Sequence, residues 1–63
     1  LLSVRYPVTD LSAYRARLAA RGITAAYAAD AVLVGGLGRV NLFAVRDPDG
    51  NITEFYEAAK ERP

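Results

Sequence analysis

The stretch that decides the fold is VNLFAVRDPDGNITEFYE, residues 40–57. Its two halves alternate between apolar and polar positions as strands do, because successive side chains of a strand point to opposite faces. Between the halves lies the sequence DPDG, residues 47–50. Proline sets the φ angle of a turn, and glycine adopts a left-handed conformation without steric cost. The stretch therefore predicts a hairpin with strands at 40–46 and 52–57.

The residues before this hairpin predict a strand followed by a helix. Alternation over residues 1–8 is typical of a half-buried strand. Thr9 or Asp10 can accept a free backbone N–H at the start of a helix of about twelve residues, and Gly22 can end that helix. The helix carries one apolar stripe that we expect to cover a sheet, made of Leu11, Tyr14 and Leu18.

The segment between helix and hairpin is rich in alanine, which has little preference for strands. We expect one strand near 23–27 and another near 31–34. Gly35, Gly36 and Gly38 then indicate a turn, and their spacing does not match a phosphate-binding loop. The predicted order is β-α-β-β-β. This is an α+β fold, a curved mixed sheet with the helix on its convex face and a polar tail at 58–63 that frays.

The composition indicates one small folded unit. Of 63 residues, 52% are hydrophobic and 24% are charged, with a net charge of +1, which excludes the disordered class. Basic residues are spread along the chain and offset by acidic ones, so no nucleic acid partner is indicated. Apolar stretches fall far short of the ~20 residues that span a bilayer, and no secretion signal opens the chain. We expect a cytoplasmic protein that does not contact membranes.

The devices that usually stabilise so small a chain are missing. It contains no cysteine and no histidine, so neither a disulfide nor a zinc site of thiolates and imidazoles can form within it. A domain of this size buries only about 60% of the surface that its unfolded chain exposes. The concave face of the predicted sheet has nothing in the chain to cover it. We therefore expect this face to meet a ligand, a second chain or further sequence.

Residues 43–56 also resemble the C-terminal signature of the vicinal oxygen chelate superfamily, which includes glyoxalase I, bleomycin and fosfomycin resistance proteins, extradiol dioxygenases and methylmalonyl-CoA epimerase. The similarity lies in the DPDGN run and in Glu54, four residues past its glycine. The entry into the helix at 8–11 and its exit at 18–23 look like the family as well. The resemblance implies that residues 1–63 form one βαβββ module. It would be the C-terminal half of a glyoxalase/bleomycin resistance/dioxygenase domain, paired with a second module of the same longer chain or of a homodimer.

In that family two modules enclose a cavity, and residues of their first and last strands bind a divalent metal such as Zn, Ni, Mn or Fe(II). The resemblance makes Glu54 the metal ligand of the last strand and a catalytic base. The matching first-strand position is Ser3, or Leu1 or Arg5 in another register. The family often has histidine there, and a serine hydroxyl is a poor ligand for a divalent metal. The cavity would be lined by Tyr6, Ile52 and Tyr56, although the two tyrosines are better explained as ordinary interface aromatics.

The resemblance implies two functions. One is a metal-dependent lyase, isomerase or dioxygenase acting on a small molecule with vicinal oxygens. The alternative is a non-enzymatic module that binds a small molecule, such as an antibiotic, as a dimer without metal. The residues also allow a plainer interpretation of Glu54, as an ion pair with Arg39 or Arg46 on a solvated face. The remaining polar residues of the hairpin are expected to satisfy amides of the turn: Asp47, Asp49 and Asn51.

Overall fold

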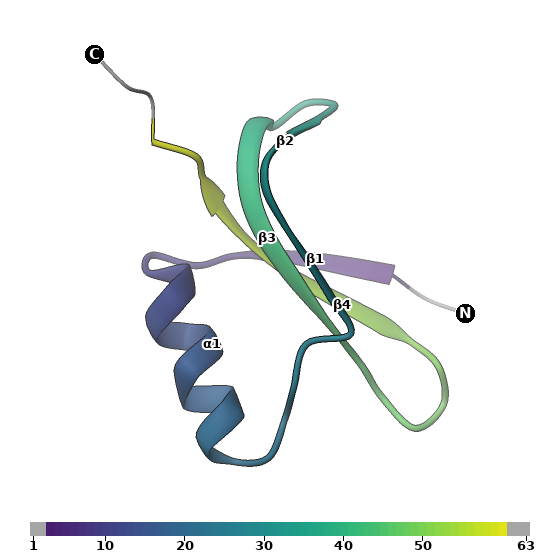
Figure 1. Ribbon diagram of the computed structural model, residues 1–63. Coiled ribbons are helices and arrows are strands. Elements are labelled where there is room, and N and C mark those ends of the chain that lie inside the picture. Colours follow the sequence, from purple (N-terminus) through teal and green to yellow (C-terminus); the bar gives the residue numbers. More distant parts are fainter. Residues whose placement is uncertain (1–2, 61–63) are drawn as a thin grey trace.

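The computed structural model describes residues 3–60, which contain one helix and four strands (Figure 1). The elements in chain order are β1 (Ser3–Pro7), α1 (Leu11–Ala20), β2 (Tyr27–Val34), β3 (Gly38–Arg46) and β4 (Ile52–Ala58). The strands form one sheet in the order β1-β4-β3-β2. β1 runs parallel to β4, whereas the other neighbouring strands are antiparallel. The predicted α+β class, mixed sheet and β-α-β-β-β order are confirmed, whereas the strand ranges expected from the sequence number five, one more than that order contains.

The helix begins and ends where the sequence predicts. Asp10 Oδ1 accepts a hydrogen bond from the backbone N–H of Ala13 at 3.1 Å, which satisfies a donor of the first turn. At the other end Gly22 has a φ angle of +82°, which glycine adopts without strain. The N–H groups of Gly22 and Ile23 donate to the carbonyls of Ala19 and Leu18, each at 2.9 Å, and so close the last turn.

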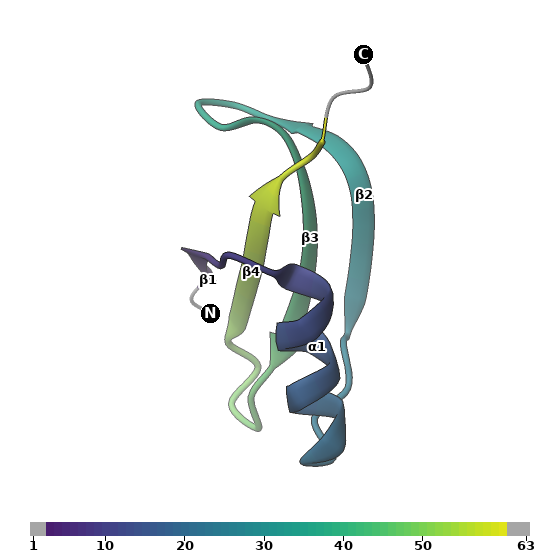
Figure 2. The same cartoon turned by 90° about the vertical axis from the view of Figure 1, so that its left-hand side faces the viewer.

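One face of the sheet is covered by α1 (Figure 2). The aromatic core lies between the helix and this face. The ring of Tyr14 lies 4.8 Å from that of Phe55 and 6.3 Å from that of Phe43, measured between centroids. Phe43 is 1% exposed. The Arg15 guanidinium lies over the Phe43 ring, 5.8 Å from its centroid. The expected contact of the helical stripe with the sheet is thus made, with Tyr14 at its centre.

The other face of the sheet is covered by no helix among residues 3–60, and we call it the open face. The pairing register places alternate residues of neighbouring strands side by side on it. These residues form rows that run across the sheet. The middle row contains Arg5, Glu54, Ala44 and Tyr27. The neighbouring row nearer the 47–50 turn contains Ser3, Ile52 and Arg46. The neighbouring row farther from that turn contains Pro7, Tyr56, Leu42 and Ala29.

The prediction for the alanine-rich segment was wrong. In place of strands near 23–27 and 31–34, a single strand, β2, runs from Tyr27 to Val34 and is interrupted by a bulge. At the bulge Ala31 has a φ angle of +54°, which is uncommon for a residue with a Cβ atom. Its N–H donates to Asn41 Oδ1 at 2.8 Å and its carbonyl accepts from the Arg39 guanidinium at 3.0 Å. Side chains of β3 thus replace the ladder bonds that the bulge removes.

The strands and the turn of the hairpin between β3 and β4 lie where the sequence predicts, and of the three polar residues expected to satisfy turn amides, Asp47 is the one shown to do so among residues 3–60. Asp47 Oδ1 accepts from the backbone N–H groups of Asp49 and Asn51, each at 2.9 Å, and Gly50 has a φ angle of +86°. These hydrogen bonds hold the pKa of the Asp47 carboxyl below its ordinary value. The Asp47 carboxylate therefore stabilises the turn.

The C-terminal tail differs from the prediction in its first residues. β4 continues to Ala58, and the N–H of Ala59 donates to the carbonyl of Arg39 at 3.0 Å, so neither residue is frayed. Residues 61–63 of the predicted tail lie outside the described residues, as do residues 1–2. No helix in the part of the chain from 3 to 60 has the length and apolar character needed to cross a bilayer.

Replacing Phe43 by alanine tests whether the aromatic core holds the fold. The change removes a fully buried ring, which typically costs about 3–5 kcal/mol of unfolding free energy. We expect the cooperative thermal transition measured by circular dichroism to be lost or strongly lowered. Leu33→Ala is the control, because Leu33 is 73% exposed and its truncation should change stability by less than about 0.5 kcal/mol. Equal effects of the two changes would contradict this placement of the core.

Candidate functional site

Glu54 lies in the middle row of the open face, with a different strand on each side. Arg5 of β1 is its partner in register on one side, and Ala44 of β3 is its partner on the other. Ala44 in turn pairs with Tyr27 of β2. Ala44 has no exposed surface, and its methyl group is small enough for Tyr27 to reach over it. The register therefore brings together side chains that are 49 and 27 residues apart in the sequence.

Each oxygen of the Glu54 carboxylate accepts a hydrogen bond. Arg5 Nε donates to Oε1 at 2.6 Å, and the Tyr27 hydroxyl donates to Oε2 at 2.5 Å. Glu54 is only 8% exposed, whereas the side chain of Arg5 is 53% exposed. Hydrogen bonds to an ionised group are the strong ones, and a carboxylate this buried requires them. We call these three residues the Arg5–Glu54–Tyr27 cluster.

The cluster lowers the pKa of Glu54 and raises that of Tyr27. The hydrogen bond from Tyr27 is the main cause that holds the pKa of Glu54 below its ordinary value; the hydrogen bond and charge of Arg5 act in the same direction, and burial opposes them. The same hydrogen bond raises the pKa of Tyr27, because its phenolate would lie beside a carboxylate. At neutral pH the site therefore contains a carboxylate, a guanidinium and a neutral phenol.

The expectation of an ion pair at Glu54 is confirmed, but both predicted partners were wrong. Arg39 lies on the other face of β3, where it bonds to the carbonyl of Ala31. Arg46 is on the open face, one row away from Glu54, and pairs in register with Ile52. The partner is Arg5, because β1 lies beside β4 in the sheet.

The other residues proposed for the site separate into two groups. Ile52 and Tyr56 lie on the open face, on either side of Glu54 along β4. Tyr6 is on the helix-covered face, where its ring stacks on that of Phe55 with centroids 6.1 Å apart. The structure therefore does not bring Tyr6 together with Ile52 and Tyr56.

Arg5 is the residue of β1 that lies beside Glu54. Ser3 pairs with Ile52, one row away from Glu54, and Leu1 lies outside the described residues. Of the three registers that the sequence left open, the structure thus selects the one with a cation at this position.

The surroundings of Glu54 in this module bear on the expected divalent metal site. Within residues 3–60 no three acidic side chains lie close enough together to hold a cation. The one carboxylate at the expected position, that of Glu54, is bonded to a guanidinium, whose positive charge repels a metal ion. Glu54 supplies one protein ligand and a catalytic zinc site takes three, so a metal here would require two further protein ligands and the displacement of Arg5.

Tyr27 is the residue of the site that sequence reasoning missed. It is the only aromatic residue between positions 15 and 42, in a segment otherwise dominated by alanine and glycine. Its isolation among small residues is the sequence signal that could have identified Tyr27, since a single large side chain among small ones is the one that contacts the residues opposite it. The contact itself depends on the register of β2 against β3, which the sequence does not contain as a local pattern.

No protein-family model, curated protein or solved structure matches this chain.

Tyr27→Phe tests the electrostatic role of the hydroxyl. The change leaves Glu54 Oε2 without its donor, so the pKa of Glu54 should rise toward its ordinary value of 4.5, as measured by an NMR titration of the side-chain carboxyl carbon. Tyr56→Phe is the matched control on the same face. A pKa of Glu54 that moves equally in both variants would contradict the assigned hydrogen bond.

The same change alters stability in acid. Because the pKa of Glu54 is lower in the folded than in the unfolded chain, its ionised form stabilises the fold above about pH 4.5, the ordinary pKa. This stabilisation is lost as the pH falls through the folded-state pKa. We expect Tyr27→Phe to lose less stability than the parent protein over this acidic range in thermal unfolding. A steeper loss in the variant would contradict the sign of the shift.

Proposed function

We propose that this chain is one βαβββ module of a two-module protein of the vicinal oxygen chelate type, and that its open face binds a small molecule without a metal. The Arg5–Glu54–Tyr27 cluster is the observation that carries the proposal. Glu54 and Arg5 occupy the last-strand and first-strand positions at which the resemblance implies metal ligands, so the carboxylate at this place already has a cation. Of the two functions that the resemblance implies, this is the non-enzymatic binding module.

The state of Glu54 also disfavours a role as catalytic base. A general base needs a pKa near the working pH and an oxygen within reach of the proton that it removes. Both oxygens of Glu54 accept hydrogen bonds inside the protein, and its pKa is lowered rather than raised. Glu54 is better suited to orienting Arg5 than to proton transfer.

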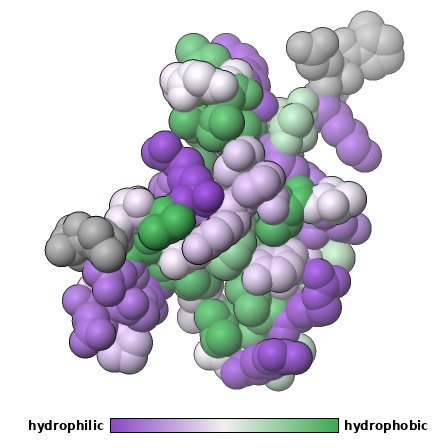
Figure 3. Space-filling view, turned by 180° about the vertical axis from the view of Figure 1, so that it is seen from behind, coloured by the Kyte–Doolittle hydropathy of each residue, from purple (hydrophilic) through white to green (hydrophobic). Residues whose placement is uncertain are grey.

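The surface of the module supports pairing with a second module. Buried apolar residues within 3–60 are few: Leu11, Val40, Leu42, Phe43 and Ala44. Hydrophobic residues reach the surface among hydrophilic ones on the side shown in Figure 3, and Tyr27 on the open face is 44% exposed. A chain of this size gains most of its missing burial from a partner. A second module placed over the open face would bury Tyr27, Ile52 and Tyr56 and enclose the cluster.

Metal titration separates the two functions. We expect no change in the thermal unfolding midpoint of the protein when Mn²⁺, Ni²⁺ or Zn²⁺ is added, because Arg5 holds the carboxylate that a metal would need. Arg5→Ala is the comparison variant, in which Glu54 is free of the cation. A saturable rise in the midpoint of the parent protein that Glu54→Ala abolishes would instead establish the metal-dependent function.

Two adjacent substitutions test pairing through the open face. Ile52 and Thr53 are neighbours on β4 that point to opposite faces, and both are partly buried. In a preparation of this 63-residue chain the second module is another copy, so sedimentation should give a particle of two chains. We expect Ile52→Lys to dissociate that particle and Thr53→Lys to leave it paired. A particle of two chains that survives Ile52→Lys as well as Thr53→Lys would contradict pairing through the open face.

A further inference from the structure

We infer that the small molecule bound at the open face is a carboxylate with an apolar body, held by the two terminal nitrogens of Arg5. This inference rests on the proposed function and adds the chemical class of the ligand. It comes from the way Arg5 is bonded, from the charges around it and from the side chains of the neighbouring rows.

The first observation is that Glu54 uses only one nitrogen of Arg5. The bond to Oε1 comes from Nε, the nitrogen nearest the backbone, at 2.6 Å. Within residues 3–60 no hydrogen bond is formed by the two terminal nitrogens, and the side chain is 53% exposed. A guanidinium has five N–H donors in a planar fork, and its terminal pair matches the two oxygens of a carboxylate. Glu54 thus fixes the orientation of Arg5 and leaves its binding end open.

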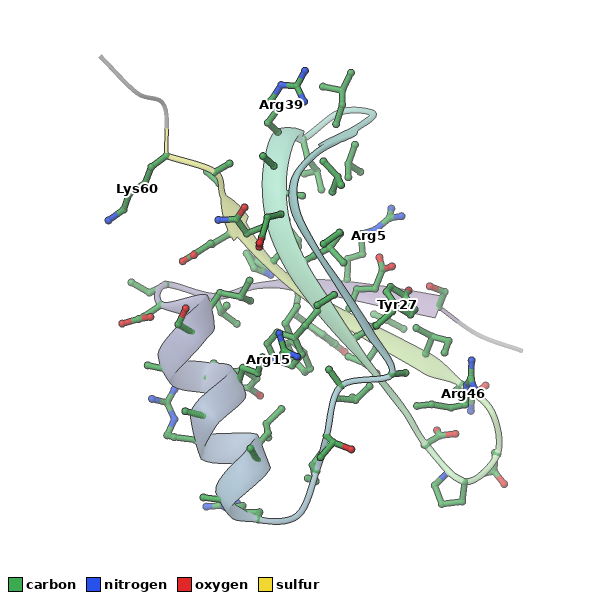
Figure 4. All side chains as sticks on the ribbon, viewed as in Figure 1. Arg5, Arg15, Tyr27, Arg39, Arg46 and Lys60 are labelled. Carbon is green, nitrogen blue, oxygen red and sulfur yellow. The ribbon has the colours of Figure 1, made fainter. Side chains whose placement is uncertain are left out.

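The second observation is an excess of positive charge on this part of the open face. Arg46 lies one row from Glu54, and Figure 4 shows Arg5, Tyr27 and Arg46 on the same side of the sheet, away from Arg15 on the helix. Glu54 is the one acidic residue in the three rows described above. Asp47 follows Arg46 in sequence, but its carboxylate accepts hydrogen bonds from the turn. Two guanidiniums against one carboxylate leave a charge that a monoanion would balance.

The third observation concerns the body of the ligand. The rows on either side of the cluster present Ile52 and Tyr56, which are partly exposed, and the ring of Tyr27 forms one border of the cluster. Apolar and aromatic walls with a few convergent polar groups are typical of small-molecule sites. An aromatic or branched carboxylate fits these neighbours, with its charged end at Arg5 and its carbon skeleton over the apolar rows.

The test compares benzoate with benzamide, which has nearly the same shape and no charge. We expect benzoate to bind the protein saturably in calorimetry or NMR titration at low salt, and benzamide to bind at least about tenfold more weakly, because it lacks the charge that strengthens hydrogen bonds to a guanidinium. Equal binding of the two probes, or no binding of benzoate, would overturn the inference.

Variants locate the binding group. Arg5→Gln should weaken benzoate binding by about tenfold or more, and Arg46→Gln should weaken it by a smaller factor. Arg39→Gln is the matched control, because Arg39 is an exposed arginine on the other face of β3, and it should leave benzoate binding unchanged. If Arg5→Gln fails to fold, the comparison of Arg46→Gln with Arg39→Gln decides: equal affinities in these two variants would overturn the inference.

A wrong ligand class and a wrong proposed function would give different results. A protein that pairs through its open face and ignores metals, yet binds benzoate and benzamide equally, retains the proposed function and loses only the anionic ligand. A protein whose Glu54 binds a metal loses the proposed function, whatever its affinity for benzoate.

Discussion

A carboxylate that is almost fully buried on a sheet must have a donor for each oxygen, and Glu54 obtains both through the order of the strands. Arg5 reaches it only because β1 lies beside β4, and Tyr27 reaches it only because the intervening residue of β3 is alanine. The parallel pairing of β1 with β4 in turn requires a long connection, which contains α1 and the strands β2 and β3. The helix, the register and the electrostatics of the site are therefore consequences of one arrangement.

Features with a local signal were predicted well from the sequence. The hairpin of β3 and β4 is specified by alternation around the DPDG turn, and α1 is bounded by Asp10 and Gly22, whose side-chain and backbone properties act within a few residues. The bulge in β2 was missed because Ala31 takes a left-handed conformation that its neighbours in sequence do not favour. It is held instead by Asn41 and Arg39 of the adjacent strand.

The composition of the site was harder to predict than the fold, because it depends on pairing between distant strands. Ser3 and Arg5 share a face of β1, and a shift of two residues exchanges them beside Glu54 without changing the alternation. Similarly, the alternation of β1 shows that Tyr6 and Arg5 point in opposite directions. It does not show which of them shares a face with Glu54. Only the register of β1 against β4 answers both questions.

The bulge at Ala31 also bears on how the molecule avoids unwanted association. β2 is an edge strand, and the exposed N–H and C=O groups of a regular edge are a template for pairing with other chains and for aggregation. At the bulge the pairing of β2 shifts and Ala31 takes a left-handed conformation, so the edge loses its regular spacing, and Asp30 places a charge beside it. Growth of the sheet into a continuous fibril at this edge is therefore hindered, which directs association toward the faces of the sheet.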